Sequence, residues 1–329
     1  KQMNRFLVIL SLVWAISFTA DAKSFDKRLS EFTYPYDTKV FSFDSQGATH
    51  EMTYMYLPPE NAMPVVLLLH GKNFTSAYWH TTADWLHKQG YGVLMPDQLG
   101  FGKSSKPVNY QYSFPVLANN TRQLIAELGL KNVIVTGHSM GGMLASRFAL
   151  NHASVTRKLI LINPIGLENY LQYVEYKDVQ FFYENELGKT PQDIVKYQTK
   201  NYYDGNWKPE YEAHAEHLTG WIKGDDWPVL AQVSARTYDM IFTQPVIEEF
   251  DRFSMPVALI LGTRDRTGPG RGWKKPGVER ELGRYDKLGE QVKKRNSQIN
   301  VLPLEGLGHL PHIEQFDAFT PVFNKALTD

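Results

Sequence analysis

Short apolar runs recur through the 329-residue chain, separated by helix-like stretches. The clearest runs lie at 65–69, 92–95, 133–135, 159–162 and 257–261. They are continuous and do not alternate apolar with polar residues, which is typical of strands buried on both faces of a sheet. Because helices are expected between them, we predict a parallel sheet covered by helices on both faces. An apolar fraction of 43% is ample for such a core.

Both ends of the chain extend this pattern. β-prone residues at 39–43 and 52–57 flank the turn Ser45-Gln46-Gly47, which predicts an opening hairpin. Towards the C-terminus we expect a helix near 277–295, a strand at 299–302 and a last helix at 315–327. Two further helices are expected near 77–88 and 115–128, between the first apolar runs.

Residues 167–250 interrupt the alternation of strands and helices. This segment is rich in Tyr, Trp and Phe and is too long for a connecting loop. Its helical spacing predicts an inserted helical cap, so that 23–166 and 251–329 together form the core domain. Most of its aromatic residues are expected to pack the cap onto the core, and a few to face a ligand cleft beneath it.

The first 22 residues resemble a secretory signal peptide. Arg5 precedes an apolar stretch at 6–16, and Ala20-Asp21-Ala22 provides the small residues of a cleavage site. The stretch is short for a permanent membrane span, although an uncleaved anchor is the alternative. The chain has no cysteine, so neither disulfides nor a lipidated cysteine are expected. We therefore predict a periplasmic or secreted protein without a stable membrane anchor after signal cleavage.

The pentapeptide Gly137-His138-Ser139-Met140-Gly141 follows the apolar strand and precedes a helix-like stretch at 143–150. Such a turn holds a serine in a strained conformation and requires small neighbours, here Gly137, Gly141 and Gly142. The same pattern also arises by chance in loops. Its position between a buried strand and a helix favours a catalytic nucleophile at Ser139.

A serine nucleophile needs a histidine base and a carboxylate that orients the histidine. Asp265 follows the strand at 257–261, and His309 follows the strand at 299–302. The carboxyl ends of parallel strands share one sheet edge, so we expect both residues near Ser139. The order serine, acid, histidine is that of one known class of hydrolases.

Other candidates for these roles are less suitable. The turn Ile162-Asn163-Pro164 has no carboxylate, which favours Asp265 as the acid. His312 lacks the carboxylate partners of a zinc site, and we expect it to form local hydrogen bonds. His138 is expected to point away from the serine and to pack in the core. No metal ligand set is predicted.

The developing oxyanion needs two backbone N–H donors. Met140, directly after the serine, is predicted to supply one. Lys72, in the turn His70-Gly71-Lys72-Asn73-Phe74, is predicted to supply the other, with its side chain free to reach solvent. The side-chain amide of Asn73 is the alternative donor. Asn73 and Phe74 are also candidate substrate contacts. A second loop, Asp97 to Ser105, is expected to provide turn and cap hydrogen bonds.

Taken together, these motifs resemble the capped branch of the α/β-hydrolase superfamily. The resemblance covers about 35–328 and rests on His70-Gly71, Asp97 to Ser104, Gly137 to Gly142, Gly262 to Asp265, and Gly308-His309 with Pro311 and Glu314. It implies an eight-stranded, mostly parallel sheet with helices on both faces and an inserted helical cap. Relatives that open epoxides or displace halide usually carry aspartate at the position of Ser139, in the turn known as the nucleophile elbow, so Ser139 indicates acyl chemistry.

We therefore predict an exported serine hydrolase that cleaves a small or medium carboxylic ester through an acyl-enzyme. The alternatives are lactone, amide, carbon–carbon or peracid chemistry with the same triad, or a non-catalytic ligand-binding protein. Segment 266–300 is longer and more charged than in many relatives, so their substrate specificity is not assigned to this chain. The expected partner is a small-molecule substrate, with no cofactor. Nucleic acid is not expected, since 35 basic residues balance 35 acidic ones without a basic stripe. Nothing indicates the oligomeric state.

Overall fold

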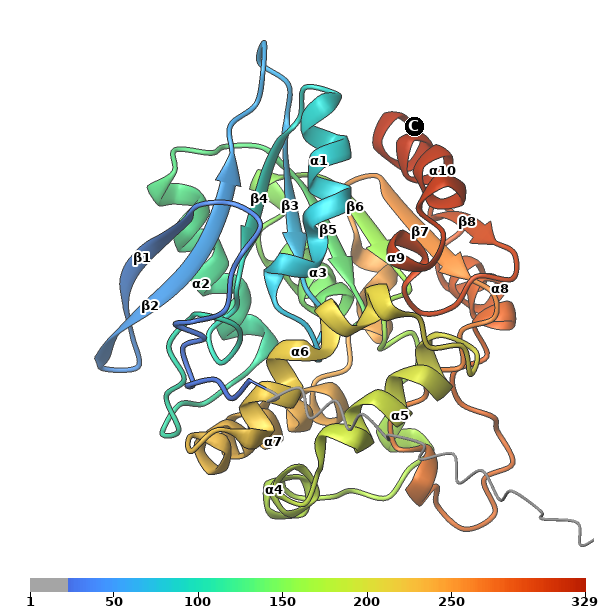
Figure 1. Cartoon of the computed structure of the whole chain (residues 1–329). Coiled ribbons are helices and arrows are strands. Elements are labelled where there is room, and N and C mark those ends of the chain that lie inside the picture. Colours follow the sequence, from blue (N-terminus) through green and yellow to red (C-terminus); the bar gives the residue numbers. More distant parts are fainter. Residues whose placement is uncertain (1–22) are drawn as a thin grey trace, which may run out of the picture.

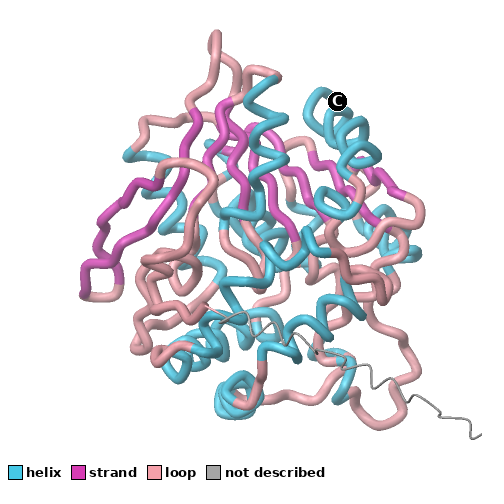
Figure 2. Tube along the Cα trace, viewed as in Figure 1, coloured by secondary structure: helices cyan, strands magenta, loops and turns pink. Residues whose placement is uncertain are grey.

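The computed structural model describes residues 23–329, in which eight strands form one sheet (Figures 1 and 2). Their spatial order is β1-β2-β4-β3-β5-β6-β7-β8. Strands β1 and β2 form an antiparallel hairpin, and β2 pairs with β4 antiparallel. The other neighbours, from β3 to β8, pair in parallel. This confirms the predicted mostly parallel, eight-stranded sheet. The strands are β1 (Thr38–Ser45), β2 (Ala48–Leu57), β3 (Val65–Leu69), β4 (Gly92–Pro96), β5 (Val133–His138), β6 (Thr156–Ile162), β7 (Val257–Gly262) and β8 (Asn300–Leu304).

Ten α-helices accompany the strands in the described part of the chain. They are α1 (His80–Lys88), α2 (Phe114–Glu127), α3 (Met140–Asn151), α4 (Val179–Leu187), α5 (Pro191–Tyr202), α6 (Pro209–Lys223), α7 (Trp227–Thr243), α8 (Tyr285–Arg295), α9 (Pro311–Glu314) and α10 (Phe316–Thr328). The helix expected from 277 begins only at Tyr285. Gly277 and Gly283 both have positive φ, and a Cβ on Gly283 would lie 2.4 Å from the Thr267 carbonyl oxygen, so the chain turns there instead.

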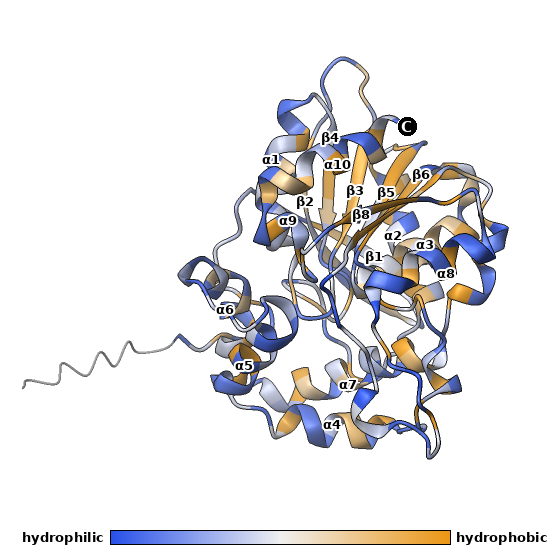
Figure 3. Ribbon diagram, turned by 90° about the vertical axis from the view of Figure 1, so that its right-hand side faces the viewer, coloured by the Kyte–Doolittle hydropathy of each residue, from blue (hydrophilic) through white to orange (hydrophobic). Residues whose placement is uncertain are grey.

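The sheet separates two apolar cores. Alternate residues of β5 point to opposite faces, with Val133 and Val135 in one core and Ile134 in the other. Helices α2, α3 and α8 cover the first face, and α1, α9 and α10 cover the second (Figure 3). Strands β3, β4, β5 and β7 are buried along their whole length, which explains their continuous apolar sequences.

Helices α4 to α7 lie between β6 and β7 in the chain, within the predicted helical insertion at 167–250, and beyond the carboxyl ends of the parallel strands (Figure 1). The N-terminal described segment packs against them. Phe25 donates its N–H to Gly220, and its ring joins an apolar cluster with Trp221 and Trp227. The insertion is therefore attached to the rest of the chain at more than its two ends.

Residues 1–22, where the signal peptide is predicted, lie outside the described residues. From Lys23 onward, no helix combines the length and apolar character needed to cross a membrane. The predicted leader stays a prediction.

Candidate active site

Ser139 occupies a sharp turn between β5 and α3. Its φ of 58° and ψ of −123° are strained for a residue with a side chain. The turn is possible because its glycines leave no Cβ where backbone atoms approach. A Cβ on Gly137 would lie 2.0 Å from the Gly141 carbonyl oxygen, and one on Gly141 would lie 2.2 Å from that of Leu69. Only glycine fits these positions without moving the backbone.

The structure brings Ser139, Asp265 and His309 together at the carboxyl edge of the sheet. His309 Nε2 lies 2.9 Å from Ser139 Oγ, and His309 Nδ1 lies 2.6 Å from Asp265 Oδ2. All three side chains are buried. Burial acts to raise the pKa of Asp265, but the adjacent His309 and the hydrogen bonds from His309 and Thr267 outweigh it and hold the pKa below its usual value.

Asn163 orients Asp265, a role that the sequence did not suggest. Its Nδ2 donates to Asp265 Oδ2 at 2.9 Å, and its Oδ1 accepts the Gly262 N–H at 2.8 Å. The Thr267 N–H donates to the other carboxylate oxygen at 2.8 Å. Asn163 follows β6, the neighbour of β7, so its position at a strand end was the available signal.

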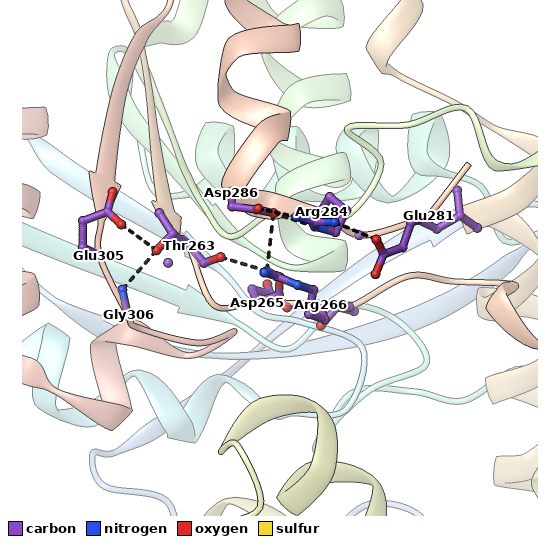
Figure 4. Close-up of polar contacts among 12 residues, drawn as sticks. Thr263, Asp265, Arg266, Glu281, Arg284, Asp286, Glu305 and Gly306 are labelled. Atoms are coloured by element: carbon purple, nitrogen blue, oxygen red, sulfur yellow. Dashed lines mark hydrogen bonds and ion pairs between the residues drawn. The ribbon is translucent and has the colours of Figure 1, made fainter. Parts of the chain in front are cut away.

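The loop that carries Asp265 is held by a network of charged side chains (Figure 4). Arg266 donates to the Thr263 carbonyl oxygen at 2.8 Å and pairs with Asp286 at 3.6 Å. Arg284 bonds both Asp286 and Glu281. Some of the charged residues of segment 266–300 thus hold the loop that carries Asp265 in place.

Tyr78 and His138 connect the turn at Ser139, the loop that carries His309 and the turn after β3. His138 Nε2 donates to the His309 carbonyl oxygen at 2.8 Å, and Tyr78 donates its hydroxyl proton to His138 Nδ1 at 2.8 Å. The Gly71 N–H donates to the same hydroxyl at 3.1 Å. Burial, with His309 and His312 nearby, lowers the pKa of His138 well below its usual value, which fits an imidazole that both donates and accepts. The prediction that His138 only packs was therefore incomplete.

The loop around His309 has a second support in Glu314. This carboxylate accepts the Gly308 N–H at 2.8 Å and pairs with Arg264 at 2.6 Å. His312 does not form the predicted local hydrogen bonds: neither ring nitrogen has a partner among residues 23–329. Instead its ring stacks on Trp79, with 4.8 Å between the centroids.

The turn predicted to supply an oxyanion donor lies beside the serine. A Cβ on Gly71 would lie 3.1 Å from Ser139 Cβ. Apart from bonds within helices and strands, the N–H groups of Lys72 and Met140 donate to no backbone acceptor in residues 23–329. Phe74 is 2% exposed and stacks on Tyr78 at 4.5 Å between centroids, so its ring has packing partners. Its contact with substrate stays a prediction.

The Lys72 side chain does not reach solvent as expected. Its ammonium donates to the Ser234 carbonyl oxygen at 2.9 Å, the Ser234 hydroxyl at 2.8 Å and the Thr237 hydroxyl at 3.2 Å, all on α7. Burial lowers the pKa of Lys72 to about 8, with Glu186 acting in the opposite direction. The loss of hydration is offset by three acceptors.

The next residue also contacts the insertion. Asn73 Nδ2 donates to the Tyr202 hydroxyl at 2.9 Å. The Tyr202 ring stacks on His309, with 4.7 Å between the centroids and 21° between the planes. A small cavity of about 30 Å³ lies next to Lys72 and Asn73, and Trp227 and Leu230 of α7 form part of its wall. Tyr202 of the insertion thus lies directly against His309.

Comparison with protein families gives a match over residues 64–275 to the family described as "alpha/beta hydrolase fold". Among solved structures, a probable hydrolytic enzyme from Pseudomonas aeruginosa is 39% identical. The match covers 94% of this chain and all of that one, with a TM-score of 0.90. A bacterial membrane phospholipase A is 21% identical, with 89% and 87% coverage and a TM-score of 0.65, and shares the fold.

Curated proteins match over shorter or more divergent regions. Uncharacterized proteins from mycobacteria, including Mycobacterium bovis, are 36% identical over 32% of this chain, and the match spans only 30% of their length. Lipase 1 of Psychrobacter immobilis is 24% identical over 77% of this chain and 73% of its own. A fluoroacetate dehalogenase of Burkholderia is 28% identical over 43% of this chain and 49% of its own.

Proposed function

The chain belongs to the α/β-hydrolase family, and on that basis we propose that it is an exported serine hydrolase that cleaves small or medium carboxylic esters. The family and its lipase and hydrolytic relatives support a hydrolase. The observation that carries the serine mechanism is the hydrogen-bonded chain from Ser139 through His309 to Asp265.

In the proposed reaction, His309 Nε2 takes the proton of the Ser139 hydroxyl while Oγ attacks the ester carbonyl carbon. Asp265, which is held ionised, accepts the Nδ1–H bond and stabilises the imidazolium that forms. The negative oxygen of the tetrahedral intermediate accepts bonds from the Met140 and Lys72 N–H groups. The alcohol leaves with the proton from His309, and water then releases the acid from Ser139 by the same steps in reverse order.

Ester cleavage is preferred over halide displacement despite the dehalogenase relative. Dehalogenation in this family usually uses a carboxylate at the elbow, whereas this chain has a serine whose oxygen is bonded to a histidine base. Export rests on the predicted signal peptide at 1–22.

A substrate panel tests the proposal. Purified protein is assayed with p-nitrophenyl esters of increasing acyl length, lactones and aminoacyl amides, in parallel with Ser139→Ala. We expect ester turnover that is lost in the variant while its circular dichroism and melting temperature are retained. Turnover of lactones or amides without esters would change the assigned bond, and equal ester rates in the variant would refute the nucleophile.

A further inference from the structure

The turn proposed to bind the oxyanion is attached to the helical insertion by two consecutive side chains. Lys72 bonds Ser234 and Thr237 on α7, and Asn73 bonds Tyr202 at the end of α5. On the core side, the Gly71 N–H bonds Tyr78. The turn is therefore held between the sheet and the insertion, and the insertion contributes to its position.

The Lys72 ammonium is fully hydrogen-bonded. An ammonium has three donor hydrogens, and here each has an acceptor within 3.2 Å. The ammonium also lies 4.9 Å from the centroid of the Tyr238 ring. On the α4 side, Ser234 Oγ donates to Glu186 at 2.9 Å, and Lys189 pairs with the same carboxylate. One side chain of the turn is thus joined to two helices of the insertion.

We infer that Lys72 is a positioning residue whose side chain, bonded to α7, holds the oxyanion turn in its working geometry. The inference rests on the proposed serine mechanism and adds a role for the insertion within it. The backbone N–H that meets the oxyanion belongs to Lys72 itself, so any shift of its side chain is transmitted to the donor within one residue. A donor displaced by a fraction of an ångström stabilises the transition state less than a pre-organised one.

Substitution of Lys72 by methionine tests this inference because it removes the ammonium but keeps the backbone N–H. Loss of an oxyanion donor typically costs about 100-fold to 1,000-fold, so loosening one should lower kcat about 10-fold to 100-fold. Because the ester contacts of the ground state are kept, we expect KM to change less than about 3-fold. Affinity for a trifluoromethyl ketone, which forms an oxyanion on the serine, should fall in parallel with kcat.

Lys106→Met is the matched control. The Lys106 ammonium also donates to three acceptors, the carbonyl oxygens of Phe101, Gly102 and Ser104, and lies over the Trp221 ring. The Lys106→Met variant also loses a buried cation, but the Lys106 side chain does not contact the turn. We expect its kcat to stay within about 2-fold of wild type even if its melting temperature falls.

Thr237→Val removes one acceptor of the Lys72 ammonium on α7. It provides a second variant that tests the inference if Lys72→Met does not fold. If Lys72 and Thr237 act together, the double variant should lose less kcat than the product of the single losses. Wild-type kcat in folded Lys72→Met, or independent effects of the two substitutions, would overturn the inference. If wild-type protein neither turns over esters nor reacts with the ketone, the proposed function fails instead.

Discussion

Tyr78→Phe removes one buried hydroxyl and leaves two buried groups without their partner. These are the Gly71 N–H, which donates to the hydroxyl at 3.1 Å, and His138 Nδ1, which accepts from it at 2.8 Å. An unsatisfied buried polar group costs about 1–3 kcal/mol, so the loss of unfolding free energy should be about 2–6 kcal/mol. The ring itself keeps its stack with Phe74.

Urea unfolding followed by tryptophan fluorescence and by circular dichroism measures this cost, provided that both probes give the same transition. Tyr36→Phe is the control, because its hydroxyl bonds Asp84 in a partly exposed place where water can substitute, and it should cost less than about 1 kcal/mol. Since Tyr78 also bonds the turn at Gly71, and His138 bonds the His309 carbonyl oxygen, ester turnover should fall as well. A cost below about 1 kcal/mol with unchanged turnover would refute the role given to this network.

Two further substitutions, Gly137→Ala and Glu314→Ala, test the supports of the site. Gly137→Ala places a Cβ 2.0 Å from the Gly141 carbonyl oxygen and should cost at least about 3 kcal/mol in urea unfolding, whereas Gly272→Ala, with nothing within 4 Å, should be neutral. Glu314→Ala leaves the Gly308 N–H and Arg264 without their shared partner and should cost about 1–3 kcal/mol; an unchanged melting temperature would contradict it.

For Asp265→Asn the pH dependence is the test. The folded pKa lies below the usual 3.8, so the carboxylate stabilises the fold above that pH, and this contribution is lost as pH falls through the lower folded value. The stability difference from wild type should therefore shrink as the pH falls below about 4, and a constant difference would contradict the direction of the shift.

Local sequence patterns predicted much of this molecule. The continuous apolar runs predicted the strands, and residues placed just after them predicted that Ser139, Asp265 and His309 would meet at one edge, as they do in the structure. These predictions succeeded because burial on both faces and strand ends leave a mark in a short stretch of sequence.

The partners of the site were less accessible from sequence. Asn163, Tyr78 and the Lys72 side chain act through residues 99, 60 and 162 positions away in the chain. Such pairs depend on how strands and helices are placed in space, and the one local signal among them was the position of Asn163 at a strand end. The prediction that a helix begins at 277 was wrong for a related reason. Two glycines with positive φ redirect the chain, and the helix begins at Tyr285.

Covalent labelling of the serine tests the central claim most directly. Folded protein is incubated with a fluorophosphonate, and the modified residue is identified by intact mass and peptide mapping, with Ser139→Ala and heat-unfolded protein alongside. The account predicts one adduct, located on Ser139, that is absent from both controls. An unlabelled folded protein, or an adduct on another residue, would contradict it.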